Sequence, residues 1–285
     1  MLKKCLLLAF LSFQISLSAQ VLSLVPHPLQ NYQHPFNERF IERNAIKSIQ
    51  VEISRKKEMD IIRSAHTFLV FDFNTEGKLI SEKKFKMGDN DTLNFAFQYD
   101  REGKLLLEQE FIGEGILEKK YHYDADGNKF KIEYRKREPF AENSNLISID
   151  SLKSMTIDGV DIQIYYNDYG RPYRETRVFY DSLGYLSKFR ETFIISHKQN
   201  SIEYHYNDFG LLKEIDYVFA LNDKTRKEVY EYNEEGVPET FLIYENDEQK
   251  KRQEFLYNPD GSLKAILFKE IESNLITIWQ LSYLK

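Results

Sequence analysis

The sequence predicts an all-β protein, built as an extended antiparallel meander of repeated β-hairpins that forms a twisted or curled sheet. Three observations predict it: a short turn motif recurs eight times, the segments between the copies alternate apolar and polar residues, and aromatic residues are abundant. The 285 residues include 19 Tyr and 21 Phe but only 7 Pro, and 42% are hydrophobic. Such a composition is too apolar for a disordered chain and too polar for a helical membrane protein.

The first 19 residues have the features of a secretory signal peptide. Lys3 and Lys4 form a basic start, an apolar run follows over residues 5–13, and small residues precede Gln20. The apolar run is shorter than the roughly 20 residues that span a bilayer, so we do not expect it to be a membrane anchor. We expect cleavage before Gln20 or one residue earlier, and export to the periplasm, the cell surface or the extracellular medium.

Cleavage would change the charge and the chemistry of the mature chain. The signal segment holds two lysines and no acidic residue, so its removal lowers the formal net charge from −6 to −8. It also holds Cys5, the single cysteine, so the mature protein would form no disulfide and no thiolate metal site. The acidic balance argues against a nucleic-acid partner, and no later segment is long and apolar enough for a membrane span in the mature form.

Residues 20–45 are expected to form a proline-containing N-terminal lead-in ahead of the repeats. Its prolines favour an extended chain, and Asn37 is placed to cap a short helix that runs to Arg43. The repeat domain is then predicted over residues 46–285. Apolar and polar residues alternate over 48–54, which predicts its first strand.

The repeated motif is an aromatic residue, then Asp or Asn, two variable residues and Gly. Its eight copies start at Phe73, Tyr99, Tyr123, Tyr166, Tyr180, Tyr206, Tyr232 and Tyr257. The Asp or Asn side chain can accept backbone hydrogen bonds within a type I turn, and Gly can adopt the positive φ that follows. A type I turn followed by a left-handed residue joins two strands with a glycine bulge, so each copy predicts a hairpin tip.

The segments that flank the tips alternate as strands do. Before the second tip, Phe95 and Phe97 share a face with Tyr99, and in five copies a leucine follows the glycine by two residues. Hairpins stacked side by side would place the motif aromatics in rows. We interpret these rows as core packing; the functional alternative is a stacking platform for sugar rings or another flat ligand.

The spacing of the motif breaks once. Successive motif glycines are 26, 24, 43, 14, 26, 26 and 25 residues apart. The 14-residue interval between Gly170 and Gly184 holds one strand, which puts these two tips at opposite edges of the sheet. The 43-residue interval contains a polar segment, 136–158, which we expect to be a loop with a helical turn over 150–155. It is either a tolerated surface insertion or a functional loop.

The last segment of the chain, residues 275–284, is rich in aliphatic and aromatic residues and alternates like a strand. We expect it to end the array and to cover the final edge of the sheet, which would otherwise present unpaired backbone groups.

The repeated unit is aromatic-x-aromatic, then Asp or Asn, two variable residues, and Gly-x-Leu. It resembles the YD repeat of Rhs-type and teneurin-type proteins over about residues 66–270, most clearly at 97–105 and 206–212. The resemblance implies a long antiparallel sheet that spirals or curls, and a role in surface contact, carbohydrate binding or cargo enclosure. The sequence contains no recognisable aspartyl self-cleavage segment or C-terminal toxin domain, so we do not expect it to enclose a cargo.

No residue pattern in the sequence indicates catalysis. The six histidines form no helical i, i+4 pair and no His-x-His pair, and there is no phosphate-binding glycine loop, nucleophile elbow or zinc motif. The acidic turns at 88–91 and 124–127 lack the full spacing of a dedicated calcium loop. We therefore predict no catalytic, cofactor-binding or metal-binding residues and no cofactor, and the ligand-binding residues stay unassigned.

These observations predict an exported, non-enzymatic β-repeat protein that presents a sheet surface to an unidentified protein or glycan partner. Two alternatives stay open. An outer-membrane β-barrel fits export and alternating strands, but Lys119 shares a face with Leu117 and Tyr121, and a lysine that faces lipid is costly. The other alternative is an enzyme whose site is assembled from dispersed carboxylates and tyrosines.

Overall fold

The computed structural model describes residues 21–25, 35–88, 93–113, 115–138, 141–220 and 224–285. The signal peptide expected over residues 1–19 and its cleavage site lie outside the described residues. Within the described part there is one α-helix, α2 (Glu38–Arg43), and it is far too short to cross a membrane. The division into a lead-in and a repeat domain stays a prediction.

Eighteen antiparallel strands make up almost all of the regular structure. They are β1 (Ser48–Lys57), β2 (Arg63–Phe73), β3 (Leu79–Lys86), β4 (Leu93–Tyr99), β5 (Leu105–Ile112), β6 (Gly115–Tyr123), β7 (Lys129–Arg137), β8 (Asn145–Ile157), β9 (Val160–Tyr166), β10 (Pro172–Tyr180), β11 (Leu186–Phe193), β12 (Gln199–Tyr206), β13 (Leu212–Phe219), β14 (Lys224–Tyr232), β15 (Pro238–Glu245), β16 (Glu248–Tyr257), β17 (Leu263–Glu270) and β18 (Leu275–Leu284).

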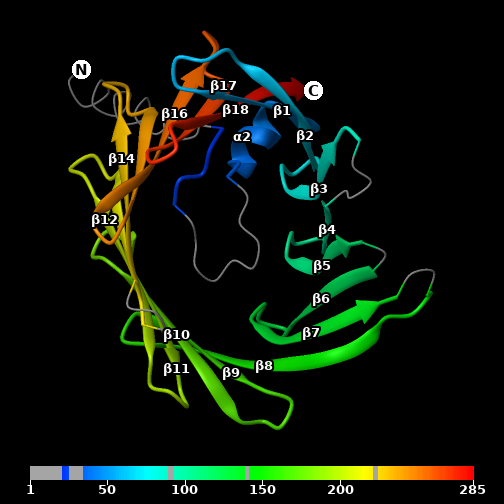
Figure 1. Cartoon of the computed structure of the whole chain (residues 1–285). Helices are drawn as coiled ribbons and strands as arrows, with labels where there is room; N and C mark the ends of the chain where they lie inside the picture. Colours follow the sequence, from blue (N-terminus) through cyan, green and yellow to red (C-terminus); the bar gives the residue numbers. More distant parts are fainter. Residues whose placement is uncertain (1–20, 26–34, 89–92, 114, 139–140, 221–223) are drawn as a thin grey trace, which may run out of the picture.

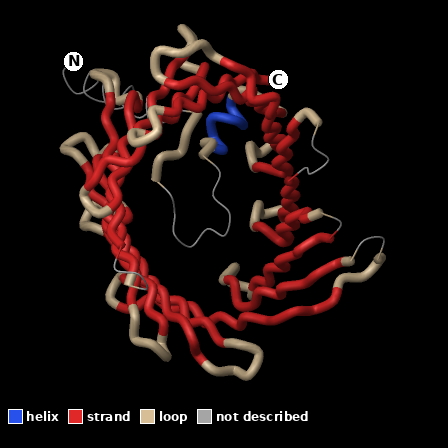
Figure 2. The backbone as a smooth tube through the Cα atoms, viewed as in Figure 1, coloured by secondary structure: helices blue, strands red, loops and turns tan. Residues whose placement is uncertain are grey.

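The strands close into a barrel (Figures 1 and 2). Each strand pairs with its neighbours in the sequence, as the meander prediction requires, and β18 also pairs with β1 from Ser48–Leu284 to Lys57–Leu275. The predicted antiparallel meander is therefore confirmed, and the sheet that was expected to be twisted or curled closes completely. The segment expected to cover the last edge instead bonds to the first strand, so neither β1 nor β18 is left as an edge strand.

The predicted turn chemistry is confirmed at the tips. At the first tip, the side-chain oxygen of Asn74 accepts the backbone N–H groups of Glu76 and Lys78 at 3.0 and 2.9 Å. Gly77 donates its N–H to the Asn74 carbonyl at 3.0 Å and has φ +77°. The strand register shifts by one residue between Asp72 and Phe73, which is the expected glycine bulge.

The break in the motif spacing has the predicted outcome in part. Gly170 lies between β9 and β10 and Gly184 between β10 and β11, so these tips lie at opposite ends of one strand. The loop expected over 136–158 is wrong over residues 145–157, which form β8. The helical turn expected over 150–155 is wrong for the same reason. Ser151 pairs with Lys131 and with Tyr166, and a segment that bonds to strands on both sides remains extended whatever its local polarity.

The described N-terminal residues, 21–25 and 35–46, lie inside the barrel, where α2 is seen in Figure 1. We call these residues the N-terminal segment. Asn37 caps this helix as predicted, since its side-chain oxygen accepts the backbone N–H groups of Arg39 and Phe40. Ile41 is fully buried, and the ring of Phe36 lies 4.9 Å from that of Phe71 on β2. The inner face of the nearby strands thus forms one hydrophobic core with the chain's own N-terminal residues.

The aromatic face of the sheet is the inner face of the barrel. Cross-strand partners share a face, and the strand register connects Phe71, which packs against the N-terminal segment, through Glu82, Phe95 and Glu110 to Leu117. Lys119 lies two residues further along the same face of β6. The lysine that argued against a lipid-facing surface in the sequence therefore points into the barrel.

Candidate functional site

Five of the motif tyrosines, together with Tyr283 of β18, form a ladder along the tips. The hydroxyl of Tyr99 donates to the carbonyl oxygen of Leu79, two residues beyond the glycine of the preceding tip, at 2.8 Å. The same bond joins Tyr123 to Leu105, Tyr206 to Leu186, Tyr232 to Leu212, Tyr257 to Pro238 and Tyr283 to Leu263. Each hydroxyl ties one hairpin to the one before it, which supports the packing interpretation of the aromatic rows.

The inner face also carries carboxylates that accept hydrogen bonds from tyrosines. Glu108 is 5% exposed and accepts from the Tyr121 hydroxyl at 2.8 Å and from the Lys119 ammonium at 2.7 Å. A second group has the same chemistry: Glu228 accepts from Tyr217 and Tyr230 and pairs with Arg226. These buried charges are matched by donors, so they are structural pairs of the kind that buried carboxylates require.

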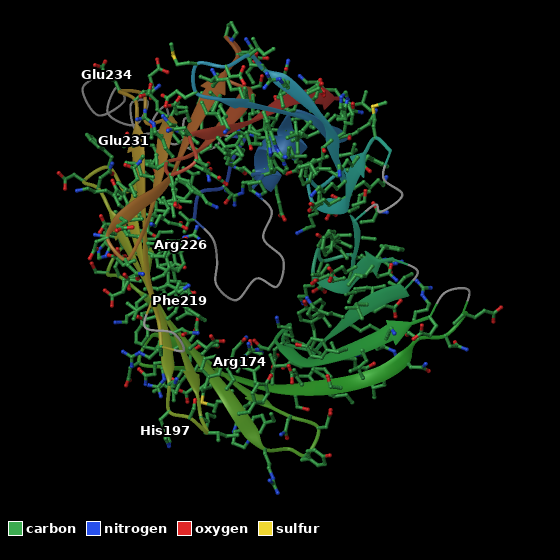
Figure 3. The ribbon with its side chains drawn as sticks, viewed as in Figure 1. Arg174, His197, Phe219, Arg226, Glu231 and Glu234 are labelled. Atoms are coloured by element: carbon green, nitrogen blue, oxygen red, sulfur yellow. The ribbon has the colours of Figure 1, made fainter. Side chains whose placement is uncertain are left out.

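A third group lies where β7, β8 and β10 face the lumen. Asp150 accepts from the hydroxyls of Tyr134 and Tyr173 at 3.1 and 2.9 Å. Burial, together with the hydrogen bond to Asp150, raises the pKa of Tyr173 to about 12, so this hydroxyl is protonated and donates at neutral pH. Nearby, the guanidinium of Arg174 lies 3.8 Å from the centroid of the Tyr165 ring. Figure 3 labels Arg174 and Arg226 on the barrel wall.

The sequence reading missed these groups because their members come from different strands. One feature of the sequence could have indicated these groups: a glutamate stands where the alternation of the strand predicts an inward, apolar residue, as at Glu108 and Glu228. The dispersed carboxylates and tyrosines of the enzyme alternative are thus brought together. In the described part of the chain, however, no histidine imidazole is hydrogen-bonded to a serine or threonine hydroxyl, the pairing that would activate a nucleophile.

A histidine and two acids gather on the outer face. Ligand atoms of His205, Glu214 and Asp216 all lie within 4.8 Å of one another, on the neighbouring strands β12 and β13. The Lys227 ammonium lies 3.0 Å from Glu214 and 3.6 Å from Asp216. The lysine contacts both carboxylates, and His205 lies 3.1 Å from Asp216, so we interpret this group as a cross-strand charge network.

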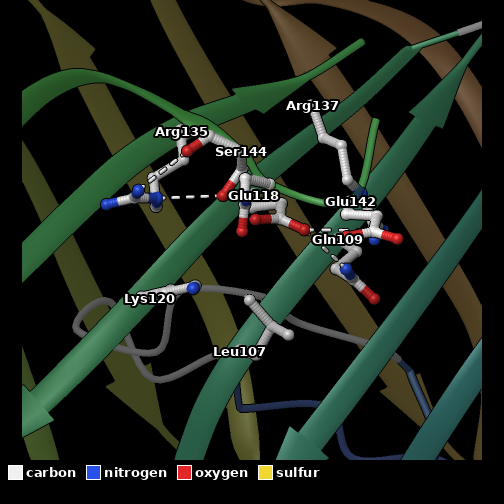
Figure 4. A pocket seen from close by; sticks show the side chains of 9 residues that line it. Leu107, Gln109, Glu118, Lys120, Arg135, Arg137, Glu142 and Ser144 are labelled. Atoms are coloured by element: carbon white, nitrogen blue, oxygen red, sulfur yellow. Dashed lines mark hydrogen bonds and ion pairs between the residues drawn. The ribbon is translucent and has the colours of Figure 1, made fainter. Parts of the chain in front are cut away.

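A pocket of about 460 Å³ opens on the outer face of β5, β6 and β7, beneath the segment that leads into β8 (Figure 4). Its lining is almost entirely polar: Leu107, Gln109, Glu118, Lys120, Arg135, Arg137, Glu142, Asn143 and Ser144. The last three belong to the 136–158 insertion, which the sequence singled out as a candidate functional loop. The long break in the repeat therefore forms one wall of the pocket.

The pocket is held by hydrogen bonds between its own walls. Arg135 donates from Nε to the Ser144 hydroxyl at 2.9 Å and from a terminal nitrogen to the Ser144 carbonyl at 2.8 Å. Glu118 accepts from Gln109 at 2.8 Å and lies 3.5 Å from Arg137. Burial opposes ionisation of Glu118, but hydrogen bonds from Gln109 and Ser144 and the charge of Arg137 lower its pKa below the usual value.

Two cationic groups in this pocket retain bonding capacity. The Nε of Arg137 is buried and makes no hydrogen bond within the described structure. The half-buried Lys120 side chain makes no ion pair with any described residue. Both point to the outer face of β6 and β7, since Lys120 pairs with Leu107 and Arg137 with Ile116 across the sheet. The pocket therefore offers donors to an oxygen-rich ligand.

The chain was compared with solved structures and with curated proteins. Among solved structures, the chain matches a porin-like protein from Bacteroides uniformis, with 10% identity, a TM-score of 0.40, and coverage of 84% of this chain and 98% of that one. It is also similar to a TcdB2-TccC3 structure, with 11% identity and a TM-score of 0.25, covering 76% of this chain and 15% of that one. A comparison with the curated proteins gave no match.

The sequence match is more extensive than these structural likenesses. The teneurin YD-shell family matches over residues 20–283, which includes the lead-in and all eight copies of the turn motif. The resemblance seen in the repeated unit is thereby confirmed, and it extends beyond residues 66–270 to both ends of the barrel. The chain belongs to the teneurin YD-shell family.

Proposed function

We propose that this protein is an exported, non-enzymatic binding protein that holds a glycan in the outer pocket of β5, β6 and β7. One observation carries the proposal: a ligand-sized pocket of about 460 Å³ with a polar lining lies where the repeat spacing breaks. Pockets that bind small ligands have volumes of roughly 300–1,000 Å³. Most of those are apolar, whereas this lining suits a ligand covered with hydroxyl or carboxylate oxygens.

The composition of the pocket favours a glycan over a protein partner. Protein interfaces are centred on buried aromatic residues, and the pocket contains none, with Leu107 as its single apolar side chain. Three basic residues face two acidic ones, and Glu118 is already occupied by Gln109 and Arg137. The surplus of positive charge favours a sugar that carries a carboxylate, such as a uronic acid, because charge-assisted hydrogen bonds are the stronger ones.

Calorimetric titration of the mature protein with oligosaccharides tests the proposal. Uronic-acid oligosaccharides should bind, and neutral oligosaccharides of the same length should bind less tightly. Arg137→Ala and Lys120→Ala should each weaken binding by about ten-fold, the value of one charge-assisted bond. The control is Lys188→Ala, which removes an outer-face lysine that pairs with Glu203 on β12, outside the pocket.

Two outcomes contradict this function. If Arg137→Ala, Lys120→Ala and the Lys188→Ala control bind equally well, the pocket is not the site. If the oligosaccharide is recovered cleaved or modified after incubation with the protein, the protein is an enzyme and the non-enzymatic part of the proposal is wrong.

The second candidate function is an outer-membrane β-barrel, and closure of the sheet is the observation that favours it. The outer face opposes it, because charged pairs lie there, including Lys131 with Glu133 at 2.8 Å and Lys83 with Asp72 at 3.0 Å. Membrane barrels present an apolar band outward and keep charges within the lumen. The mature protein should therefore purify without detergent as a monodisperse species; aggregation that detergent reverses would favour the membrane barrel instead.

A further inference from the structure

The tip of the β1–β2 hairpin exposes three large apolar side chains in a row. Met59 is 99% exposed, Ile61 is 69% exposed and Ile62 is 60% exposed. The tip projects beyond the neighbouring strand on one side, since β3 pairs with β2 only from Thr67 onward. Exposed aliphatic side chains gathered at one protruding tip are costly in water and mark a surface that contacts something else.

Basic residues flank these apolar side chains. Arg55, Lys56 and Lys57 precede the tip at the end of β1, and Arg63 follows it at the start of β2. Residues 55–63 hold four basic residues and two acidic ones, although the whole chain carries a net charge of −6. The tip is therefore a basic, apolar element on an acidic protein.

Both acids at the tip are neutralised within the protein. Asp60 accepts from Arg63 at 2.7 Å, and Glu58 pairs with Lys269 of β17 at 2.9 Å. Arg55 and Lys56 make no ion pair with any described residue, so their charges are available to a partner. The hairpin thus presents aliphatic side chains at its apex and unpaired positive charge behind them.

The opposite rim of the barrel provides the contrast. Leu183 and Phe209 are as exposed there, at 78% and 77%, but they lie in turns that begin with Asp181 and Asn207-Asp208. Exposed apolar residues are thus present at both ends, but among these three tips positive charge surrounds them at the β1–β2 tip alone. The combination, and not exposure alone, distinguishes this hairpin from the tips that carry Leu183 and Phe209.

We propose that the β1–β2 tip docks on a membrane surface that contains anionic phospholipid. Met59, Ile61 and Ile62 would enter the boundary between head groups and acyl chains, while Arg55, Lys56 and Lys57 lie against the phosphates. Long basic side chains suit this position, because their apolar stems lie along the bilayer and their charged ends reach the head groups. This contact goes beyond the proposed glycan function and is independent of it, since the outer pocket is formed by other strands.

Co-sedimentation with vesicles tests the proposal on the mature protein. The protein should bind vesicles of phosphatidylglycerol and phosphatidylcholine, and should not bind vesicles of phosphatidylcholine alone. The triple variant Met59→Ser, Ile61→Ser, Ile62→Ser should bind at least ten-fold more weakly. The matched control Leu183→Ser, Phe209→Ser removes equally exposed side chains from the other rim and should bind as the unaltered protein does. Equal thermal unfolding of both variants shows that the fold is kept.

A second pair of variants tests the charge. Arg55→Glu, Lys56→Glu should weaken binding by roughly five-fold or more for each residue changed, as expected for basic side chains at an anionic surface. Lys153→Glu, Lys264→Glu alters two exposed lysines elsewhere and serves as the control. Raising the salt concentration should weaken binding to the anionic vesicles.

Four results with vesicles would overturn the proposal. They are no binding to the anionic vesicles, equal binding by the triple serine variant, equal binding to both kinds of vesicle, and displacement by inorganic phosphate alone, which would indicate a site for free phosphate. If the triple serine variant instead changes the sedimentation coefficient of the protein without vesicles, the tip is a contact between copies of the chain.

Discussion

Two regions of the barrel wall carry different kinds of side chain on their inner faces. Around β1 and β2 the inner face is aliphatic and aromatic, with Ile49, Val51 and Phe71 all under 5% exposed, and it packs against the N-terminal segment. Around β5 to β9 the inner face carries tyrosines with charged partners, such as Tyr121 with Glu108. We call these the covered region and the uncovered region.

The difference shows that the chemistry of the inner face follows what lies against it. In the covered region, the helix and its flanking residues replace water, so each apolar side chain gains burial on both sides. In the uncovered region no described segment of the chain lies over the wall. Tyrosine suits that position because its ring packs along the sheet while its hydroxyl finds an acceptor. Four predictions test this comparison, from the largest expected effect to the smallest.

Gly77→Ala should cause the largest loss of stability. A β-carbon at Gly77 would lie 2.0 Å from the carbonyl oxygen of Glu38 in α2, and φ there is +77°. The steric clash and the backbone strain should together cost about 2–5 kcal/mol in the free energy of unfolding. Gly261→Ala is the control, since Gly261 has φ +80° but no atom near the added carbon, and should cost about 1–2 kcal/mol. Equal losses in urea unfolding would mean that α2 does not dock on this tip.

Glu108→Leu should destabilise the uncovered region, although it places an apolar residue at a buried position. The change leaves the Tyr121 hydroxyl and the Lys119 ammonium without their acceptor, which should cost about 1–3 kcal/mol. Glu110→Leu, on the same face of the same strand, makes a matched control with an expected effect below about 0.5 kcal/mol. Chemical unfolding measures both effects. If Glu108→Leu is stabilising, the uncovered region, like the covered region, is more stable with an apolar side chain on its inner face.

Lys129→Leu should stabilise the protein by about 1–2 kcal/mol at pH 7. Lys129 stands two residues after a motif glycine, where the covered region has the fully buried Leu79 and Leu263. Burial lowers the pKa of Lys129 to about 8, whereas an unfolded lysine titrates near 10.4. Between these values the unfolded chain binds more protons, so this lysine makes stability rise with pH from about 8 to 10. The rise should be smaller in Lys129→Leu, and an unchanged pH profile would contradict the assignment.

The tyrosine ladder should contribute equally in both regions. Tyr99→Phe in the covered region and Tyr123→Phe in the uncovered region each remove one bond to a backbone carbonyl and should each cost about 0.5–1.5 kcal/mol. Thermal unfolding measures the difference between the two. If only Tyr99→Phe is destabilising, the ladder depends on the N-terminal segment and is not a property of the repeat.

Much of the local structure could be predicted from short stretches of sequence. The Asn74 turn, the strand that begins at Ser48 and the helix capped by Asn37 each depend on residues within a few positions of one another. The segment 150–155 could not be predicted in this way, because its polar residues lie inward or outward according to strands on either side. The sequence indicated the insertion that forms one wall of the outer pocket, but not the pocket itself. The walls of the pocket come from four separate segments of the chain, and only the fold brings them together.

The sequence by itself determined where the chain bends, because an Asp or Asn three residues before a glycine specifies a turn through its own hydrogen bonds. Only the tertiary structure decided that the ribbon closes. Pairing of Ser48 with Leu284 satisfies backbone groups 236 residues apart, which depends on the curvature accumulated over eighteen strands. Closure also gave the sheet an inner face. The aromatic face became the inner one, because the apolar N-terminal residues are removed from water when they pack against it.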